Sequence, residues 1–253
     1  MENPNIRLSE IDEERFGVRS ARAFEVKAET LGAITDFCRA NQVLLLMARC
    51  SASDIRAAQA MEREGFLLMD TLVYYVCDMA KRGNPQDSTD ITVRPVKPGE
   101  EAQVEAIAID SFRNYFGHYH ADERLDRVKC DEAYRSWALR SCKFRDVANE
   151  VLVALLQNRV VAFASLCLNN SRDGEGVLFG VAPSAQGQGI YRSLMVNGMQ
   201  WCLAKGRTRM VVSTQITNIA VQKVWTRLGF ESDHAVYTFH KWFDDPTGER
   251  TTH

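Results

Sequence analysis

The sequence predicts an α/β protein built in two unequal halves, and three observations support this prediction. Apolar runs typical of strands alternate with segments of helical apolar spacing along most of the 253 residues. The apolar run at residues 176–181 meets a glycine-rich turn, after which a helical pattern begins at Ile190. A polar segment with Gly and Pro, residues 81–90, separates two strand-like runs and is typical of a linker.

Each predicted element has its own signal in the chain. Before the linker, the period and the turn residues predict strand, helix, strand, helix and strand over residues 16–26, 28–40, 42–49, 53–64 and 66–78. After it come a strand, a helix, a long helical and loop region and a hairpin, over residues 91–96, 100–112, 113–144 and 151–168. Three strands with two helices between them complete the chain near Trp242. We therefore expect an N-terminal subdomain, a linker, a main domain and a flexible tail, at residues 1–80, 81–90, 91–243 and 244–253.

The bulk composition is that of a soluble globular protein and argues against several classes. Hydrophobic residues make up 45% and charged residues 25%, with a net charge of −2. This charge gives no drive toward nucleic acid or an anionic membrane, and no apolar run approaches the roughly 20 residues of a membrane span. Seven cysteines without a Cys-x-x-Cys pair predict reduced thiols in a cytoplasmic protein, with no disulfide or metal role.

The glycine-rich turn at residues 186–189 is the most informative segment. A helix that starts after such a turn leaves backbone N–H groups without partners, and its dipole adds positive potential there. The turn therefore predicts an anion site suited to phosphate or pyrophosphate. The Walker pattern is absent because no Gly-Lys-Ser/Thr follows, and the dinucleotide fingerprint lacks its third glycine.

A second strand and helix follow at residues 209–230. Asn218 is a favourable N-cap residue, and Gly229 suits the left-handed C-cap. The apolar residues between them fall on one helix face, namely Val221, Val224, Trp225 and Leu228. The segment thus predicts a short amphipathic helix with defined ends.

Together the two segments resemble motifs A and B of the GNAT superfamily of acyl-CoA N-acyltransferases. Motif A, Val-x-Pro and then Gln/Arg-x-x-Gly-x-Gly/Ala, is matched at 181–183, Gln186 and Gly189, whereas Tyr191 stands where Gly or Ala is usual. Motif B begins at Asn218 and closes with Leu-Gly-Phe at 228–230. The resemblance implies a mixed, mostly antiparallel sheet flanked by helices, with acetyl-CoA as the acyl donor and no metal.

The resemblance also implies which residues contact the donor. The turn would hold the pyrophosphate, and the strand that ends at Val181 would bind the pantetheine and stabilise the oxyanion. Trp225 stands where the family usually has a tyrosine that protonates the leaving thiolate, and an indole N–H is not a usable acid. Two interpretations of Trp225 remain: a core residue, or a contact with the thioester end. The expected donor contacts are Val181, Gln186, Gly187, Gln188, Gly189, Ile190, Tyr191, Asn218 and Trp225.

Residues 54–66 repeat the spacing of residues 218–230, with Asp54 in the place of Asn218 and a Gly-Phe pair at the end. We interpret the N-terminal part as a degenerate half of the same fold that lacks motif A. The alternative is that any strand–helix–Gly–strand unit would align in this way.

Residues 111–125 concentrate aromatic rings and two of the five histidines after a predicted helix. Aromatic rings stack on nucleobases and sugars, and arginine binds phosphate. With residues 131–137, the run resembles the TDP-fucosamine acetyltransferase class, which acetylates nucleotide-linked amino sugars for bacterial surface polysaccharides. An aromatic loop that only fills a gap between helices is the other interpretation. The expected acceptor contacts are Tyr115, Tyr119, Arg124, Ser213, Gln215, Tyr237 and His240.

The amine must lose a proton, and His118 or His120 has a suitable pKa, with Glu175 as the next candidate. The sequence therefore predicts acetyl transfer to a small-molecule amine, most specifically on a nucleotide-linked aminodeoxy sugar. Transfer to an antibiotic, polyamine or amino acid, a CoA-binding protein without turnover, and a module for another diphosphate stay open. Neither nucleic acid nor membrane is expected as a partner, and the oligomeric state stays open, a homodimer included.

Overall fold

The computed structural model describes residues 4–83, 85–87 and 89–243, which form two compact units. The described residues of the first unit are 4–72, 116–129 and 234–243, and all others belong to the second. The predicted boundaries at 80 and 91 follow chain order, whereas these units combine segments distant in sequence. Residues 116–129 and 234–243, predicted within the main domain, lie in the first unit.

The first unit contains the strands β1 (Ile6–Leu8), β2 (Ser20–Ala23), β3 (Leu45–Ser51) and the second half of β10 (Glu231–Trp242), in that spatial order. The β2–β3 pair is parallel, and the β1–β2 and β3–β10 pairs are antiparallel. A strand was expected over residues 16–26, but the helix α1 (Glu10–Phe16) occupies its beginning. Neither α1 nor the three-residue β1 was expected.

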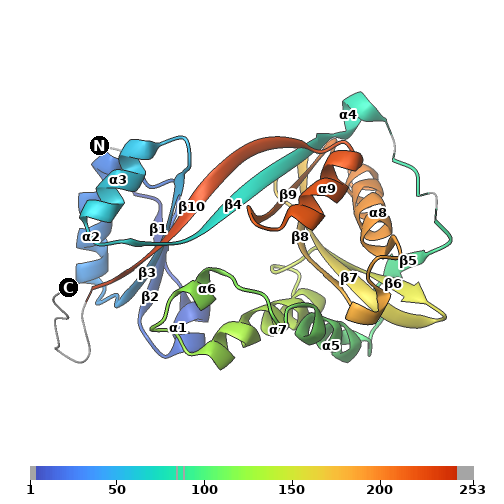
Figure 1. Cartoon of the computed structure of the whole chain (residues 1–253), viewed down its shortest axis with the longest axis horizontal. Coiled ribbons are helices and arrows are strands. Elements are labelled where there is room, and N and C mark those ends of the chain that lie inside the picture. Colours follow the sequence, from blue (N-terminus) through green and yellow to red (C-terminus); the bar gives the residue numbers. More distant parts are fainter. Residues whose placement is uncertain (1–3, 84, 88, 244–253) are drawn as a thin grey trace. The chain divides into compact units, whose positions relative to one another are not determined.

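Side-chain alternation gives the sheet of the first unit one apolar face and one polar face. Leu46, Ala48 and Cys50 of β3 pack with the helices α2 (Leu31–Ala40) and α3 (Ile55–Arg63) in one buried cluster. The intervening residues of β3 face the other side, where α1 and α6 (His118–Ala121) lie (Figure 1). Buried polar groups collect on that second face, as described below.

The second unit contains β4 from Val73 onward and the strands that follow it in the spatial order β4-β9-β8-β7-β6-β5. Their bounds are β4 (Leu67–Asp78), β5 (Thr92–Pro95), β6 (Glu150–Leu156), β7 (Arg159–Leu168), β8 (Asp173–Val181) and β9 (Arg209–Gln215). The strands β5 to β8 pair antiparallel, and β8 pairs parallel with β9. The mixed, mostly antiparallel sheet predicted from the resemblance is therefore confirmed.

Helices cover both faces of this second sheet. Leu152 and Ala154 of β6 pack in the cluster of α8 (Ile190–Ala204), whereas Val151 and Val153 pack in the cluster of α5 (Glu101–Ser111). Figure 1 shows α8 and α9 (Ile219–Arg227) on one side, and α5 and α7 (Arg127–Lys143) on the other. The short helix α4 (Met79–Arg82) follows β4, and three-residue 3₁₀ turns occupy Ala28–Thr30 and Pro183–Ala185.

The internal repeat is reproduced in the backbone. The side chains of Asp54 and Asn218 cap α3 and α9 by accepting from the N–H three residues later. Both helices end at a left-handed glycine, Gly65 at φ 77° and Gly229 at φ 87°. In each, the phenylalanine that follows donates its N–H to the carbonyl five residues earlier. The shared ends fit a common origin for the two strand–helix–strand units.

Candidate functional site

The glycine-rich turn adopts an open conformation at the start of α8. Gly187 and Gly189 have positive φ angles of 75° and 80°, a region that side chains rarely adopt. Within the described chain, the backbone N–H groups of residues 187–192 donate to no backbone carbonyl. A Cβ added at Gly189 would meet only Thr89 Cγ2, at 4.0 Å. The turn therefore presents a run of free N–H groups with space in front of them, as an anion site requires.

Beside this turn, the strands β8 and β9 separate. Their parallel pairing runs from Asp173–Arg209 to Gly176–Val212 and then ends, although β8 continues to Val181. The pairing of β8 with β7 shifts register between Ser165 and Leu166 of β7, which leaves one extra residue in β8 opposite this step. Residues 178–181 are therefore paired with β7 alone, and Val177 has no partner in either neighbouring strand.

The open edge of β8 carries backbone groups at its last residue. The N–H of Ala182 donates to Val161 of β7, so alternation points the N–H of Val181 away from β7. The carbonyl of Val181 accepts from Ser111 Oγ at 3.0 Å and from Gln186 Nε2 at 3.2 Å. The side chain of Gln186 thus braces the turn against the strand, and the N–H of Val181 remains available on the open edge.

Tyr191 and Trp225, the two departures from the family pattern, contact each other. Trp225 is 2% exposed in the core cluster of α8, and its Nε1–H donates to the Tyr191 hydroxyl at 2.9 Å. The ring of Tyr75 lies 5.5 Å from the Trp225 ring. Burial raises the pKa of the Tyr191 hydroxyl, against the hydrogen bond from Trp225. The packing interpretation of Trp225 thus has direct geometric support.

Asn218 acts locally in the structure. Its Oδ1 accepts from the N–H of Val221, and its Nδ2 donates to Thr214 Oγ1 at 3.0 Å. Its predicted contact with the pantetheine stays a prediction, as do the other donor contacts.

A group of predicted residues shares the face of the sheet that carries α5. Glu175 of β8 pairs with Val211 of β9, and Ser213 and Gln215 follow at alternate positions. Burial raises the pKa of Glu175, although a hydrogen bond from Asn169 Nδ2 at 2.8 Å opposes this. The structure thus brings Glu175, Ser213 and Gln215 to one face.

Tyr115 belongs to the second unit, apart from the rest of the predicted acceptor segment. Its ring lies edge-on to Phe112 at 5.6 Å and to Tyr134 at 4.8 Å. The rings of Phe112 and Tyr134 stack at 4.7 Å. This trio joins the end of α5 to α7 by ring packing, which is the role that the alternative interpretation of the segment gives to its aromatic rings.

The predicted linker is anchored next to the turn, a feature that the sequence interpretation missed. Asp87 accepts from Thr89 Oγ1 at 2.9 Å, from Ser193 Oγ at 3.3 Å and from Asn197 Nδ2 at 3.2 Å. Ser193 and Asn197 lie in the first two turns of α8. A polar segment with Gly and Pro carries no signal for such anchoring, because the partners are distant in sequence.

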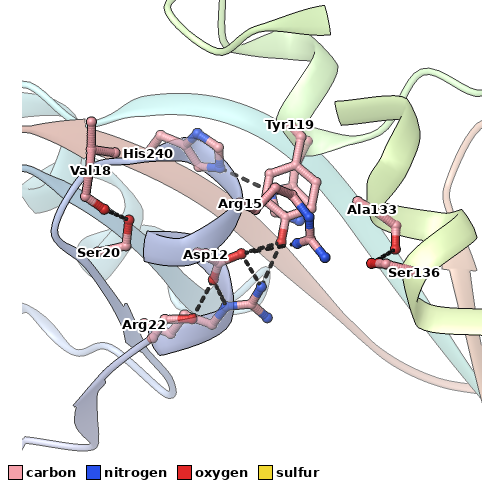
Figure 2. Close-up of polar contacts among 11 residues, drawn as sticks. Asp12, Arg15, Val18, Ser20, Arg22, Tyr119, Ala133, Ser136 and His240 are labelled. Atoms are coloured by element: carbon pink, nitrogen blue, oxygen red, sulfur yellow. Dashed lines mark hydrogen bonds and ion pairs between the residues drawn. The ribbon is translucent and has the colours of Figure 1, made fainter. Parts of the chain in front are cut away.

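In the first unit, the polar face of the sheet holds a buried ion pair. Arg22 of β2 donates to both carboxylate oxygens of Asp12, at 2.6 and 2.9 Å, and also to the Tyr119 hydroxyl at 2.6 Å. Tyr119 in turn donates to Asp12 at 2.7 Å (Figure 2). Burial raises the pKa of Asp12, but the hydrogen bond and charge of Arg22 outweigh it, and the net pKa is lowered. Tyr119, predicted to bind the acceptor, is thus 6% exposed and fully engaged in this network.

His118, His240 and Asp122 form a hydrogen-bonded chain on the same face. Asp122 Oδ2 lies 2.7 Å from His240 Nδ1, and His240 Nε2 lies 2.9 Å from His118 Nδ1. Asp122 also accepts from Trp242 Nε1 at 3.0 Å and from the backbone N–H of Arg124 at 3.1 Å. Burial raises the pKa of Asp122, but the hydrogen bonds from His240 and Trp242 dominate and lower it. Asp122 lies in the run that resembles the TDP-fucosamine acetyltransferase class, but it was not predicted as a site residue.

The other predicted acceptor residues in this unit lie elsewhere. His120 is buried, and its Nδ1 accepts from the N–H of Gly117 in the turn that starts α6. The guanidinium of Arg124 lies 3.9 Å from the centre of the Trp242 ring. Tyr237 packs on the apolar face with Phe239, so it does not share a face with His240. Their roles toward an acceptor stay predictions.

All seven cysteines are free thiols. Among the residues that the structure describes, no cluster of three or more His, Cys, Asp or Glu side chains could hold a metal ion. In the same described ranges, no helix has the length and apolar character to cross a bilayer.

The sequence matches the Acetyltransferase (GNAT) family over residues 102–230, which is 129 of its 253 residues. It is 24% identical over 204 residues to the spore coat polysaccharide biosynthesis protein SpsD of Bacillus subtilis (strain 168). That alignment covers 78% of this chain and 66% of the relative, so the chain spans just under two thirds of the relative's length.

Solved structures share the fold over nearly the whole chain. A GCN5-related N-acetyltransferase from Sphaerobacter thermophilus superposes with a TM-score of 0.65 at 14% identity, covering 96% of this chain and 78% of its own. A tandem GNAT protein from the clavulanic acid biosynthesis pathway gives 0.62 at 13% identity, covering 90% of this chain and 77% of its own. At these identities the likeness supports the fold.

Proposed function

The chain belongs to the GNAT acetyltransferase family, and on this premise we propose that it acetylates the amine of a nucleotide-linked aminodeoxy sugar. Membership supports an acyl-CoA-dependent acetyltransferase that acts on a small-molecule amine. One observation carries the proposal: the open edge of β8 after Gly176 lies next to the free N–H groups of the turn at 187–192. A CoA molecule needs these two features side by side, because its diphosphate would bind the free N–H groups and its extended, amide-bearing pantetheine arm would pair with the open strand edge.

The proposed donor contacts follow from the backbone. The N–H groups of the turn would bind the pyrophosphate, with the N-terminal dipole of α8 adding favourable potential. The pantetheine would pair with the open edge of β8, as a strand would. The N–H of Val181 would then donate to the thioester oxygen as it becomes an oxyanion, because it points away from β7.

The acceptor class is supported by one relative's name and by the local sequence resemblance. The relative SpsD is named for polysaccharide biosynthesis, and the local sequence resemblance is to enzymes that act on nucleotide-linked sugars.

We propose His118 as the group that removes the amine proton. His120 is the weaker candidate, because its Nδ1 is engaged by the backbone of its own turn. Glu175 remains the alternative, since its raised pKa and its position on β8 in the second unit suit a base. The neutral amine would attack the thioester carbon, and collapse of the tetrahedral adduct would give the amide and a thiolate, which takes up a proton.

An acceptor panel scored by release of free thiol tests the proposal. Acetyl-CoA is supplied with a nucleotide-linked amino sugar, the same sugar without its nucleotide, a polyamine, an aminoglycoside and an amino acid. We expect the nucleotide-linked sugar to give the highest kcat/KM. Preference for the polyamine or the amino acid would refute the acceptor class while retaining the donor. A cytoplasmic location and a homodimer stay predictions.

The donor site has a separate test that excludes a module for another diphosphate. Calorimetry compares CoA with the same nucleotide lacking the pantetheine arm. We expect CoA to bind more tightly, because the arm pairs with the open edge of β8. Equal affinities would show that the turn serves a diphosphate alone.

A further inference from the structure

The chain Asp122–His240–His118 lies wholly within the first unit and is built from two elements. His118 is the first residue of α6, Asp122 follows its last residue, and His240 comes from β10. His240 is 1% exposed, and His118 is partly buried. The carboxylate is fixed by two further donors, Trp242 Nε1 and the N–H of Arg124. The direction of each hydrogen bond in this chain follows from the protonation state of its members.

The directions follow from the carboxylate. An ionised Asp122 only accepts, so His240 must carry its proton on Nδ1. In neutral His240 the Nε2 is then an acceptor, and His118 must donate to it from Nδ1. The remaining nitrogen of His118, Nε2, therefore holds a free lone pair.

The surroundings keep His118 neutral before reaction. Burial is the first cause that lowers its pKa well below 6.5, and nearby positive charge adds to it, from a neighbouring histidine ring when that ring is protonated and from Arg49 and Arg22. Arg22 is paired with Asp12 and Tyr119, whereas Arg49 donates from Nε to Thr238 at 3.3 Å. The ring of Tyr119 lies 4.0 Å from the His118 ring.

His118 also lines a small cavity in the first unit. The cavity has a volume of about 10 Å³ and is further lined by Arg22, Phe24, Arg49 and Thr238, among others. This volume is about that of one water molecule. A general base can act through one water, and a water in this cavity would lie beside His118.

We propose that Asp122 and His240 are positioning residues that hold His118 in the tautomer whose Nε2 accepts the proton of the acceptor amine. This inference rests on the proposed function, in which His118 is the base. An ammonium N–H breaks as the proton moves to Nε2, directly or through the water. His118 becomes an imidazolium, and Asp122 stabilises its charge through His240. The proton then passes to solvent as the neutral amine forms its bond to the acyl carbon.

The tautomer can be measured without any activity. Histidine ring nitrogens labelled with nitrogen-15 report by NMR which nitrogen of each ring is protonated. We expect His118 to be protonated on Nδ1 and bare on Nε2, and His240 to be protonated on Nδ1. The opposite tautomer of His118 in the full chain would overturn the proposal, whatever the enzyme acetylates.

Kinetics test the positioning role with a matched pair of variants. Asp122→Asn removes the anion, so we expect kcat to fall by about tenfold or more while the KM for acetyl-CoA is unchanged. The apparent pKa of the acid limb should also fall, because the imidazolium loses its stabilising charge. Trp242→Phe removes another donor to the same oxygen but leaves the chain intact, and should keep the pH profile of the wild type.

The outcomes separate the two proposals. An active wild type whose kcat and pH profile are unchanged by Asp122→Asn would overturn the positioning role but keep the acetyltransferase. A wild type that releases no thiol with any amine would refute the proposed function, and the NMR tautomer would still decide the geometry of the chain. An Asp122→Asn variant that does not fold would leave that same measurement on the wild type as the deciding one.

Discussion

The contact between Tyr191 and Trp225 gives a prediction whose size follows from the structure. Trp225 is 2% exposed, so its indole N–H has no access to water once the Tyr191 hydroxyl, at 2.9 Å, is removed. Tyr191→Phe keeps the ring but leaves this donor buried and unpaired. We expect the free energy of unfolding to fall by about 1–3 kcal/mol, the cost of an unsatisfied buried polar group.

A double-mutant cycle isolates that hydrogen bond from packing. Trp225→Phe alone should cost no more than about 1–3 kcal/mol through lost volume, and the double variant should cost less than the two single losses added together. The coupling should reach about 1 kcal/mol. Urea unfolding gives each value from the midpoint, provided that the slope m is unchanged among the variants.

Trp201 supplies the matched control. Its buried Nε1 has no hydrogen-bond partner among the described residues, so Trp201→Phe removes no hydrogen bond. It should therefore cost packing alone and show no coupling to Tyr191→Phe. A Tyr191→Phe variant within about 0.5 kcal/mol of the wild type, the usual range for surface substitutions, would refute the reasoning. Trp225→Phe should also keep most of the activity, because an indole N–H is not an acid at this step.

Three further predictions follow. Gly189→Val should weaken CoA binding by about tenfold or more in calorimetry. Gly206→Val, at a similar φ of 73° and beyond the far end of α8, is the control, because it should carry the same backbone strain without this loss of affinity. Equal CoA affinities of the two variants would exclude the turn from the donor site. The folded chain keeps His118 neutral because its pKa is lowered, whereas the unfolded chain binds a proton there below pH 6.5, so the free energy of unfolding should fall as the pH drops through that value. Urea titrations of His118→Gln should lack this slope, and a slope that persists would assign it to another group. Glu175→Gln should retain most of kcat and gain stability at neutral pH, because burial disfavours the carboxylate there; a loss of about 100-fold in turnover would make Glu175 the base.

Local patterns predicted most of the second unit, because its elements carry their own start and stop signals. The cap at Asn218, the glycine at 229 and the turn at 186–189 lie where the sequence placed them. The strand predicted over residues 16–26 was wrong in its first part, since α1 is short and its apolar pattern is weak. The three-residue β1 is also too short for any periodicity to be seen.

The candidate site was predictable only where the residues are close in sequence. His118 and His240 were both selected, but their contact joins residues 122 positions apart and no local pattern encodes it. Asp122, whose carboxylate contacts His240, was part of the run that carries the resemblance, but nothing local in the sequence indicated this contact. Tyr237 was grouped with His240, whereas strand alternation places the two on opposite faces of β10.

The most direct measurement follows the acetyl group itself. Radiolabelled acetyl-CoA is incubated with a nucleotide-linked amino sugar, and the product is isolated and its acylated atom identified by NMR. We expect label in an amide on the sugar nitrogen, formed together with one equivalent of free thiol. The Gly189→Val variant should not form this labelled product. Label that remains on CoA, or that appears on a hydroxyl oxygen or on an unrelated amine alone, would contradict it.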